Sequence, residues 1–298
     1  MESTRDIKGR IKSVTNIQQI TKAMKMVAAA RLRKAEEKAA GARPYADKVG
    51  ELLRRASANV TGFDSPLLRA GEVKKVGYLV ISADKGLAGA YNSNVMKKIV
   101  AEISDKDRDS YKLYLCGKQS HNYLKFRGIQ ENSYHFGFSD KPQAQDALEL
   151  AKEMIDEFIS GEVDEVYVIY TKFFTALRQQ VTMTRLLPIV ADAGDTASQD
   201  AADNGVQAEP EEFMFLTDAN TVLTRLLPES VQVQIYSSML QSAASELGSR
   251  MAAMTAATDN ATERIADLNL TYNKARQAQI TNEISEIVGG ANALEYVP

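Results

Sequence analysis

Apolar and small side chains recur at steps of three and four between Gln232 and Val288, a stretch with one glycine and no proline. That spacing places them on one face of an α-helix on the order of 85 Å long, at about 1.5 Å per residue. The positions are Ile235, Met239, Ala243, Leu247, Met251, Met254, Thr258, Ala261, Ile265, Leu268, Tyr272, Ala275, Ile284 and Ile287. From Met254 to Ala275 the alternation of four and three is typical of a left-handed coiled coil, which needs a partner helix.

The pattern of apolar positions in residues 3–59 predicts that partner helix. Ser3 or Thr4 is placed to cap its first turn. Its apolar stripe comprises Ile7, Ile11, Val14, Ile17 or Ile20, Met24, Val27, Leu32, Ala35, Val49, Leu52, Leu53 and Ala56. Pro44 is expected to kink the helix. Because this helix leads into the middle of the chain and the last helix leads out of it, the two should pair antiparallel, with both chain ends at one tip.

The period of the pattern changes between residues 72 and 190. The run VGYLVI at Val76–Ile81 is typical of a strand that is buried on both faces. Further strands are predicted at Tyr111–Cys116, Ile129–Phe136, Val166–Tyr170 and Gln180–Pro188, and helices at Asn94–Ile103, Ser120–Phe126 and Ala144–Ile159. Strands that alternate with helices indicate a mostly parallel sheet, with the last strand at its edge.

The chain is therefore predicted to be an α/β protein, in which an antiparallel coiled coil of long N- and C-terminal helices joins an α/β middle domain. The expected parts are an N-terminal coiled-coil helix at 1–59, the middle domain at 72–190, an acidic mobile loop at 191–212 and a C-terminal coiled-coil helix at 218–298. Asn59–Gly71 is interpreted as a linker and Phe213–Phe215 as a short strand. Pro228 is expected to bend the chain before the long helix.

The two ends of the chain carry opposite charge. Residues 1–40 hold ten lysines or arginines against four acidic residues, and residues 231–298 hold four against seven. Paired helices with such ends would attract each other. We expect no signal peptide, and no apolar run reaches about 18 residues, so a membrane role would require partners. The expected compartment is the cytosol or an inner organelle space.

The stretch SADKGLAGAYNSN at Ser82–Asn94 lies between a predicted strand and a predicted helix, where glycines could cradle a phosphate. Gly86 and Gly89 match neither the dinucleotide-binding pattern nor the P-loop pattern. A tight turn at a sheet edge is the favoured interpretation. The alternative, an enzyme with a nucleotide at Lys85–Asn92, predicts that the chain alone binds ATP or NAD.

No catalytic or metal-binding set is evident in the sequence, and no cofactor is predicted. His121 and His135 are the only histidines, and neither lies at ligand spacing from another metal-binding residue type. Asp164 and Glu165 open a strand and are interpreted as solvated rather than as an acid–base pair. Cys116, the single cysteine, is expected to be a buried core thiol.

The basic N-terminal helix has two interpretations. Its lysines and arginines could contact nucleic-acid phosphates. They alternate with an apolar stripe, however, and no aromatic residue is interleaved for base stacking. A helix with one face on its partner and a cationic face toward an acidic protein surface is favoured, so we expect no nucleic-acid partner.

Two long stretches carry a resemblance to a known family. IKGRIKSVTNIQQITKAMKMVAAARLRKA at Ile7–Ala35 and ASELGSRMAAMTAATDNATERIADLNLTYNKARQAQITNEISEIVGGANA at Ala244–Ala293 resemble the two terminal helices of the gamma subunit of F-type ATP synthase. VGYLVISADKGLAGAYN is similar to the strand and turn of that family, where SDRGLCGG(F/Y)N is usual. The resemblance covers nearly the whole chain.

The resemblance implies the non-catalytic central rotor shaft of the F1Fo complex. In this family the coiled coil lies inside a hexamer of three alpha and three beta subunits, and the Rossmann-like middle domain contacts the epsilon subunit and the c-subunit ring. Proton or sodium flow turns the ring, and the shaft drives the beta catalytic sites through their conformations. The implied location is the cytoplasmic side of the cell membrane. The segment IVGGANAL would suit an apolar bearing.

The resemblance also implies partner-contact residues. Arg276 and Gln277 match a pair that hydrogen-bonds an acidic catch loop of beta, a role that suits the planar guanidinium. Met24 matches a position facing the moving lever of beta, and Arg250 matches a charged position implicated in coupling. The alternatives are a solvated rod residue for Arg276, plain packing between the helices for Met24 and an ordinary surface arginine for Arg250.

Some positions depart from the family pattern. Ala88 and Ala90 stand where Cys and Gly are common, and Asn282 and Ser285 stand where Gln and Thr are common. The acidic loop at 192–212 has no cysteine pair, which favours a bacterial protein over the chloroplast relatives. A coiled-coil scaffold that self-associates through its rods is the remaining alternative.

Overall fold

The computed structural model describes residues 3–59, 65–69, 71–189 and 219–295. The predicted acidic loop, the predicted strand at Phe213–Phe215 and part of the predicted linker lie outside the described residues. The chain divides into two compact units, which are Met1–Ala28 with Met251–Pro298 (the coiled-coil unit) and Ala29–Arg250 (the globular unit). Helices α1 (Thr4–Asn59) and α5 (Ala219–Glu295) contribute to both units.

The globular unit is built on a five-stranded sheet in the order β3-β2-β1-β4-β5. The strands are β1 (Val76–Ile81), β2 (Tyr111–Cys116), β3 (Ser133–His135), β4 (Glu165–Phe173) and β5 (Gln179–Leu187). The first four are parallel, and β5 is the antiparallel edge strand. The predicted α/β class and edge strand are confirmed. The strand expected at Ile129–Phe136 is shorter, because the Ile129 N–H closes the preceding helix on the Leu124 carbonyl at 3.0 Å.

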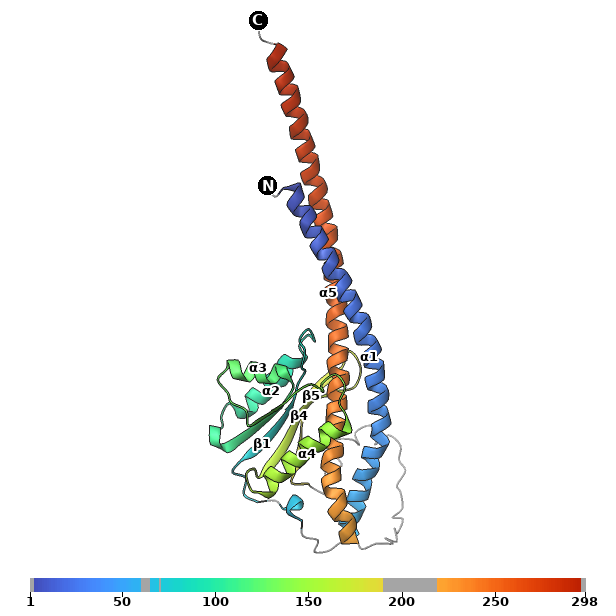
Figure 1. Cartoon of the computed structure of the whole chain (residues 1–298), viewed down its shortest axis with the longest axis vertical. Helices are drawn as coiled ribbons and strands as arrows, with labels where there is room; N and C mark the ends of the chain where they lie inside the picture. The colour runs from blue at the N-terminus through green and yellow to red at the C-terminus, as the bar shows by residue number, and fades with distance from the viewer. Residues whose placement is uncertain (1–2, 60–64, 70, 190–218, 296–298) are drawn as a thin grey trace. The chain divides into compact units, whose positions relative to one another are not determined.

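Helices cover both faces of the sheet (Figure 1). Helices α2 (Tyr91–Ile103) and α3 (Lys118–Phe126) pack on one face, and α4 (Ala144–Ile159) and α5 pack on the other. Two 3₁₀ turns, η1 (Pro66–Leu68) and η2 (Arg108–Ser110), complete the described elements. Leu67 is 4% exposed and belongs to the core on the α4 and α5 face, so this part of the predicted linker is packed structure.

Neither long helix is interrupted at its proline. Helix α1 runs through Pro44, and α5 begins at Ala219 and runs through Pro228. The last long helix therefore begins before Pro228, whereas it was expected to begin after a bend at this residue. The kink at Pro44 stays a prediction. A proline in a helix interior costs about 3 kcal/mol through its missing N–H and its ring. In α5, burial of the flanking Leu227 and Val231 against the sheet offsets that cost, since each is 1% exposed.

In the coiled-coil unit, each helix has one row of shielded side chains at alternating steps of four and three, which we call the seam. On α5 the seam holds Met251, Met254, Thr258, Ala261, Ile265, Leu268, Tyr272 and Ala275, as predicted. On α1 it holds Ile7, Ile11, Val14, Gln18, Thr21, Lys25 and Ala28. Ser3 caps α1, because its hydroxyl accepts from the Asp6 N–H at 3.2 Å.

The α1 seam differs from the predicted stripe in its middle. Ile17, Ile20 and Val27 are 52%, 58% and 53% exposed. Polar residues take the shielded positions at this level because they hydrogen-bond across the seam. Thr258 donates to the Thr21 hydroxyl at 2.9 Å, and Gln18 donates to the Thr262 hydroxyl at 2.7 Å. An apolar row therefore stays on the outer face of α1.

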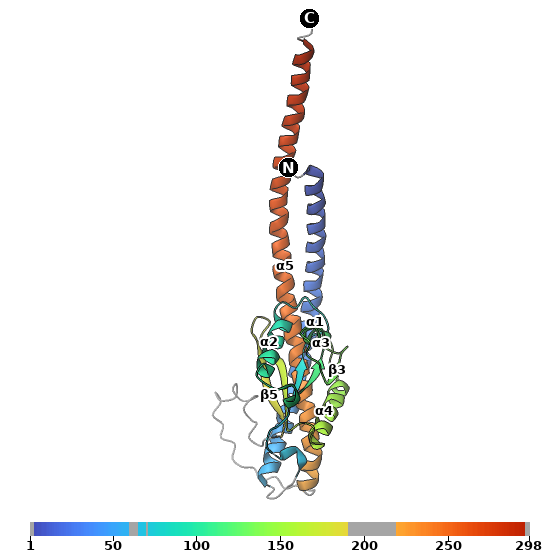
Figure 2. The same ribbon diagram turned by 90° about the vertical axis from the view of Figure 1, so that its left-hand side faces the viewer.

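Antiparallel pairing of the two helices was expected to bring both chain ends to one tip. In the structure, the two ends do not meet. The Thr4 hydroxyl donates to Gln279 Oε1 at 3.1 Å, so α1 begins opposite Gln279. Helix α5 continues past this point to Glu295, as Figure 2 shows in red. Residues 276–291 are all exposed. Among the described residues, no helix is both long enough and apolar enough to span a bilayer.

Candidate functional site

A buried ion pair on α5 is the most unusual feature of the globular unit. Glu246 is 1% exposed and Arg250 is 7% exposed. They lie four residues apart, on the same helix face. Arg250 Nη2 donates to Glu246 Oε1 at 2.5 Å and to the Gly86 carbonyl at 3.2 Å. The alternative of an ordinary surface arginine at position 250 is therefore wrong, because the guanidinium is enclosed and joins α5 to the β1–α2 turn.

The β1–α2 turn (residues 82–90) is fixed in place by side-chain hydrogen bonds. The Ala83 N–H donates to Asn92 Oδ1 at 3.0 Å, and Asp84 Oδ2 accepts from the Gly137 N–H at 2.9 Å. The turn follows β1, the central strand, so it lies at the edge of the sheet where the parallel strands end. At its tip Leu87 is 65% exposed and has a φ of 62°. A left-handed leucine costs roughly 1–2 kcal/mol, and such strain is typical of functional positions.

Asp140 forms an ion pair with Lys85, the lysine of this turn. Its Oδ2 accepts from Lys85 Nζ and, at 3.0 Å, from Arg31 Nη1. Burial would raise the pKa of Asp140, but the hydrogen bond from Lys85 and the charges of Lys85, Arg250 and Arg31 hold it below its ordinary value. Lys85 is therefore committed to a carboxylate within the chain, which argues against the alternative of a phosphate held at Lys85–Asn92.

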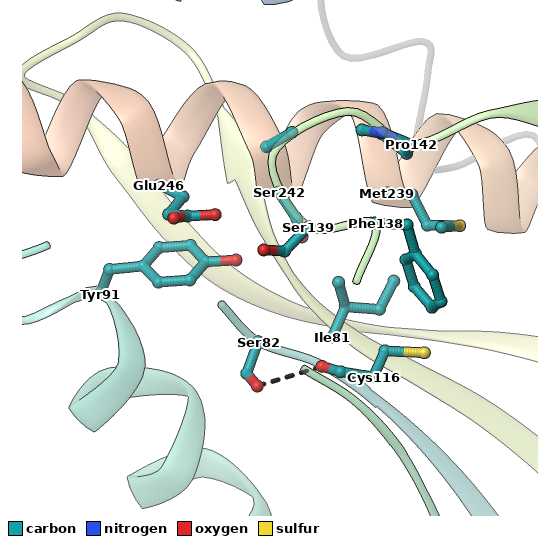
Figure 3. A pocket seen from close by; sticks show the side chains of 11 residues that line it. Ile81, Ser82, Tyr91, Cys116, Phe138, Ser139, Pro142, Met239, Ser242 and Glu246 are labelled. Carbon is teal, nitrogen blue, oxygen red and sulfur yellow. Dashed lines mark hydrogen bonds between the residues drawn. The ribbon is translucent and has the colours of Figure 1, made fainter. Parts of the chain in front are cut away.

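A small cavity lies behind the turn, between the sheet and α5 (Figure 3). Its volume is about 10 Å³, and Ser82, Tyr91, Cys116, Ser242 and Glu246 are among its lining residues. Figure 3 shows the Tyr91 ring beside the Glu246 carboxyl. A space of this size holds roughly one water molecule, whereas ligand pockets measure roughly 300–1,000 Å³. This cavity cannot accommodate a nucleotide.

Burial perturbs the titrating groups around this cavity. It raises the pKa of Glu246 to about 7, and Arg250 opposes that shift only in part. It also raises the pKa of the Tyr91 hydroxyl and of the Cys116 thiol. Cys116 is 1% exposed, which confirms the predicted core thiol. Glu246 was missed at the sequence level; its only signal was an acidic residue within the small-residue run AASELG.

The two histidines pair with carboxylates of the same unit. His121 Nδ1 lies 2.6 Å from Glu131 Oε1, and His135 Nε2 lies 2.8 Å from Glu153 Oε2. The hydrogen bond that His135 donates to the Glu153 carboxylate raises the pKa of His135 despite partial burial. Among the described residues, no group of three or more potential ligand side chains gathers in a way that could hold a metal ion.

Asp164 has a structural role that the sequence did not indicate. Its Oδ2 accepts from the backbone N–H groups of Lys74 and Lys75 at 2.8 and 2.7 Å. The expectation of a merely solvated pair was therefore wrong for Asp164, because these bonds position the chain that enters β1. Glu165 accepts from the Tyr167 hydroxyl at 3.0 Å and so is also engaged in local structure.

The structure separates the residues implied by the resemblance. Met24 is half-buried, whereas Arg276 and Gln277 are exposed on α5 beyond the seam. Because Thr21 contacts Thr258, Met24 lies near the level of residue 255. At about 1.5 Å per residue, Arg276 is roughly 30 Å further along α5. Met24 and the Arg276–Gln277 pair therefore belong to two distinct contact regions of the coiled-coil unit.

An open cationic groove lies between α1 and α5 in the coiled-coil unit. Its volume is about 470 Å³, and Arg5, Arg10 and Arg264 line it together with Asp6 and Leu268. The arginines come from both helices. Planar guanidinium groups bind carboxylates in pairs of hydrogen bonds, so this groove fits an acidic protein segment.

The chain matches a family model described as ATP synthase over residues 3–294. The ATP synthase gamma chain of Heliobacterium modesticaldum is 46% identical over 294 residues, covering 99% of this chain and 100% of the relative. The gamma chain of Brevibacillus brevis is 42% identical over 291 residues, covering 97% of this chain and 98% of the relative.

Solved structures share the fold at lower identity. A chain in the cryo-EM structure of the OSCP/F1/c-ring part of the Euglena gracilis mitochondrial ATP synthase has a TM-score of 0.68 and 17% identity, covering 99% of this chain and 96% of its own. A chain in the central stalk/c-ring structure from Tetrahymena thermophila has a TM-score of 0.59 and 22% identity, covering 80% of this chain and 99% of its own.

The pKa of Glu246 predicts a pH-dependent effect of Glu246→Gln. Because the folded pKa, about 7, lies above the ordinary value of 4.5, this group's contribution to stability is complete at low pH and is lost as the pH rises through about 7. The glutamine variant lacks this loss. Its free energy of unfolding relative to the unmodified chain should rise by about 2–3 kcal/mol between about pH 5 and about pH 8.

Urea unfolding of both chains across this pH range measures the difference. Glu263→Gln, on the exposed surface of α5, is the matched control and should show a difference that does not change with pH. A Glu246→Gln difference that is equally flat would contradict the raised pKa of the buried Glu246 carboxyl.

Proposed function

The chain belongs to the ATP synthase gamma-chain family, and from this membership we propose that it is the central rotor shaft of an F1Fo ATP synthase. The family resemblance drawn from the sequence is confirmed. In this role the chain is a non-catalytic subunit, which couples ion flow through the membrane ring to the conformational cycle of the beta catalytic sites. Protons or sodium ions would be the coupling ion.

The unpaired end of α5 carries this proposal. Beyond Gln279, where α1 begins, residues 280–291 are all exposed, and Ile280, Ile284 and Ile287 form a row at steps of four and three that is 43%, 57% and 71% exposed. A lone helix with an apolar row is marginal in water and needs a partner surface. The inner wall of an alpha–beta hexamer would supply that surface, and small residues at the helix end would let the wall slide past.

The outer face of α1 supports the same proposal. Ile17, Ile20 and Val27 are 52%, 58% and 53% exposed, and Lys12 and Lys22 of the same helix are also exposed. An apolar row with cationic neighbours fits a protein surface that is partly acidic. A coiled coil surrounded by partner subunits needs such a second interaction face, whereas an isolated scaffold coil does not.

The proposed partners are the hexamer of three alpha and three beta subunits, the epsilon subunit and the c-subunit ring. We assign Arg276 and Gln277 to the acidic catch loop of beta, and Met24 to its moving lever. Arg250 is buried, so we assign its coupling role to positioning: it holds the β1–α2 turn through the Gly86 carbonyl. The proposed location is peripheral, on the cytoplasmic side of the cell membrane. The four-part division of the chain at 1–59, 72–190, 191–212 and 218–298 stays a proposal.

Reconstitution tests this function. Purified alpha and beta subunits of a close relative are combined with this chain, and both co-elution and steady ATP hydrolysis are measured. We expect one copy of the chain to join three alpha–beta pairs and to raise steady turnover. A chain that forms a homodimer and neither co-elutes with the hexamer nor changes turnover would favour the scaffold alternative and defeat the proposal.

Arg276→Ala tests the assigned contact region. Removing the guanidinium should lower the turnover of the reconstituted complex by about tenfold, because a charge-assisted bidentate contact contributes about 1.5–3 kcal/mol. Lys274→Ala, two residues away and also exposed, is the matched control and should change turnover by less than about twofold. If the two substitutions lowered turnover equally, the positive charge of this part of α5, and not a specific contact of Arg276, would determine turnover.

A further inference from the structure

The turn between β4 and β5 presents an apolar side chain to solvent. The Phe174 N–H donates to the Arg178 carbonyl at 3.2 Å, and the Arg178 N–H donates to the Thr175 carbonyl at 3.2 Å. These bonds close the turn tightly around Leu177. The Leu177 side chain is 91% exposed. A tight turn with a fixed backbone has lost most of its conformational entropy before any partner binds, so it is preorganised for docking.

The same turn is braced directly against α5. A Cβ atom at Gly248 would lie 2.8 Å from Gln179 Nε2 and 3.4 Å from the Ala176 Cα atom, so the glycine permits this close approach. Ser249 donates to Gln179 Oε1 at 2.6 Å, and Gln179 Nε2 donates to the Ala176 carbonyl at 3.2 Å. A load on the turn therefore reaches α5 through a short hydrogen-bonded path.

The surroundings of Leu177 are cationic. Arg178 Cζ lies 4.9 Å from the centre of the Phe174 ring. The sequence from Lys172 to Arg178 contains no acidic residue. Within the described part of the chain, the Arg178 guanidinium makes no ion pair, and the Phe174 ring holds it in place. An apolar tip with positive charge at its rim is complementary to an apolar pocket with an acidic rim.

We propose that the β4–β5 turn is a docking point for an acidic segment of the alpha–beta hexamer, with Leu177 as the apolar anchor and Arg178 as the ion-pairing group. The inference rests on the proposed rotor function. The cationic rim at Arg178 favours an acidic partner surface, and the hexamer is the proposed partner to which an acidic segment is assigned. Through Gly248, this contact passes force to α5 independently of the coiled-coil seam.

Site-directed cross-linking identifies the occupant. Cys116 is the single cysteine and is 1% exposed, so Leu177→Cys provides the one accessible thiol of the chain. A thiol-linked photo-cross-linker at this position, in the assembled complex, should give a product with an Asp- or Glu-rich segment of alpha or beta. A product with epsilon or the c-ring, or no product, overturns the inference. Phe126→Cys is the matched control because Phe126 is also 91% exposed, and it should give no hexamer product.

A functional readout separates this docking point from the proposed function itself. Leu177→Ser with Arg178→Gln should weaken ATP-driven turnover of the reconstituted complex by about tenfold, as expected for loss of an anchor residue. Phe126→Ser should leave turnover unchanged. If the unmodified chain fails to join the hexamer, the rotor function fails. If it joins and the double variant is as active as Phe126→Ser, only the docking inference fails.

Discussion

Helix α5 is held to the globular unit by a row of almost completely buried side chains, and the rest of the architecture depends on this attachment. Leu223, Leu227, Val231, Ile235 and Met239 are at most 3% exposed and share one core with α4 and the sheet. Burial of five such side chains contributes on the order of 10 kcal/mol as an upper estimate. The helix that enters the coiled coil thus also packs in the hydrophobic core against the sheet. A torque on the coiled-coil unit or on the globular unit therefore acts on the same helix.

Polar contacts then fix parts of the globular unit to α5 at successive turns. Ser245 donates to the Thr171 carbonyl at 3.0 Å, Gly248 admits the β4–β5 turn, and Arg250 binds the Gly86 carbonyl. Each contact needs a small or precisely charged residue, which explains why this part of α5 is poor in large apolar side chains. The enclosed Glu246–Arg250 pair is costly to desolvate, so its value lies in fixing position and not in stability. Leu87 and Leu177 are the exposed tips of the two turns that this segment holds.

The sequence predicted the elements well and the contacts poorly, for a physical reason. Periodicity reports which face of a helix is apolar, and it gave the α5 seam from Met251 to Ala275 correctly. It failed on α1 at Ile17 and Ile20, because hydrogen bonds across the seam at Thr21 and Gln18 decide which residues face inward. Among the site residues, the placement of Arg250 and the role of Glu246 depend on backbone groups distant in sequence, which no local pattern encodes. The start of the last helix was placed too late for the same reason, since tertiary packing offsets the local cost of Pro228.

Rotation is the most direct test of the central claim that this chain is the shaft that turns inside its partner subunits. With the hexamer fixed to a surface and a bead attached at Phe126→Cys on the globular unit, addition of ATP should produce stepwise rotation of the bead in one direction. The attachment point is suitable because Phe126 is 91% exposed and the native Cys116 is buried. Hydrolysis of ATP by the assembled complex while the bead stays still would contradict the account. It would mean that the chain is a fixed part of the assembly and not its shaft.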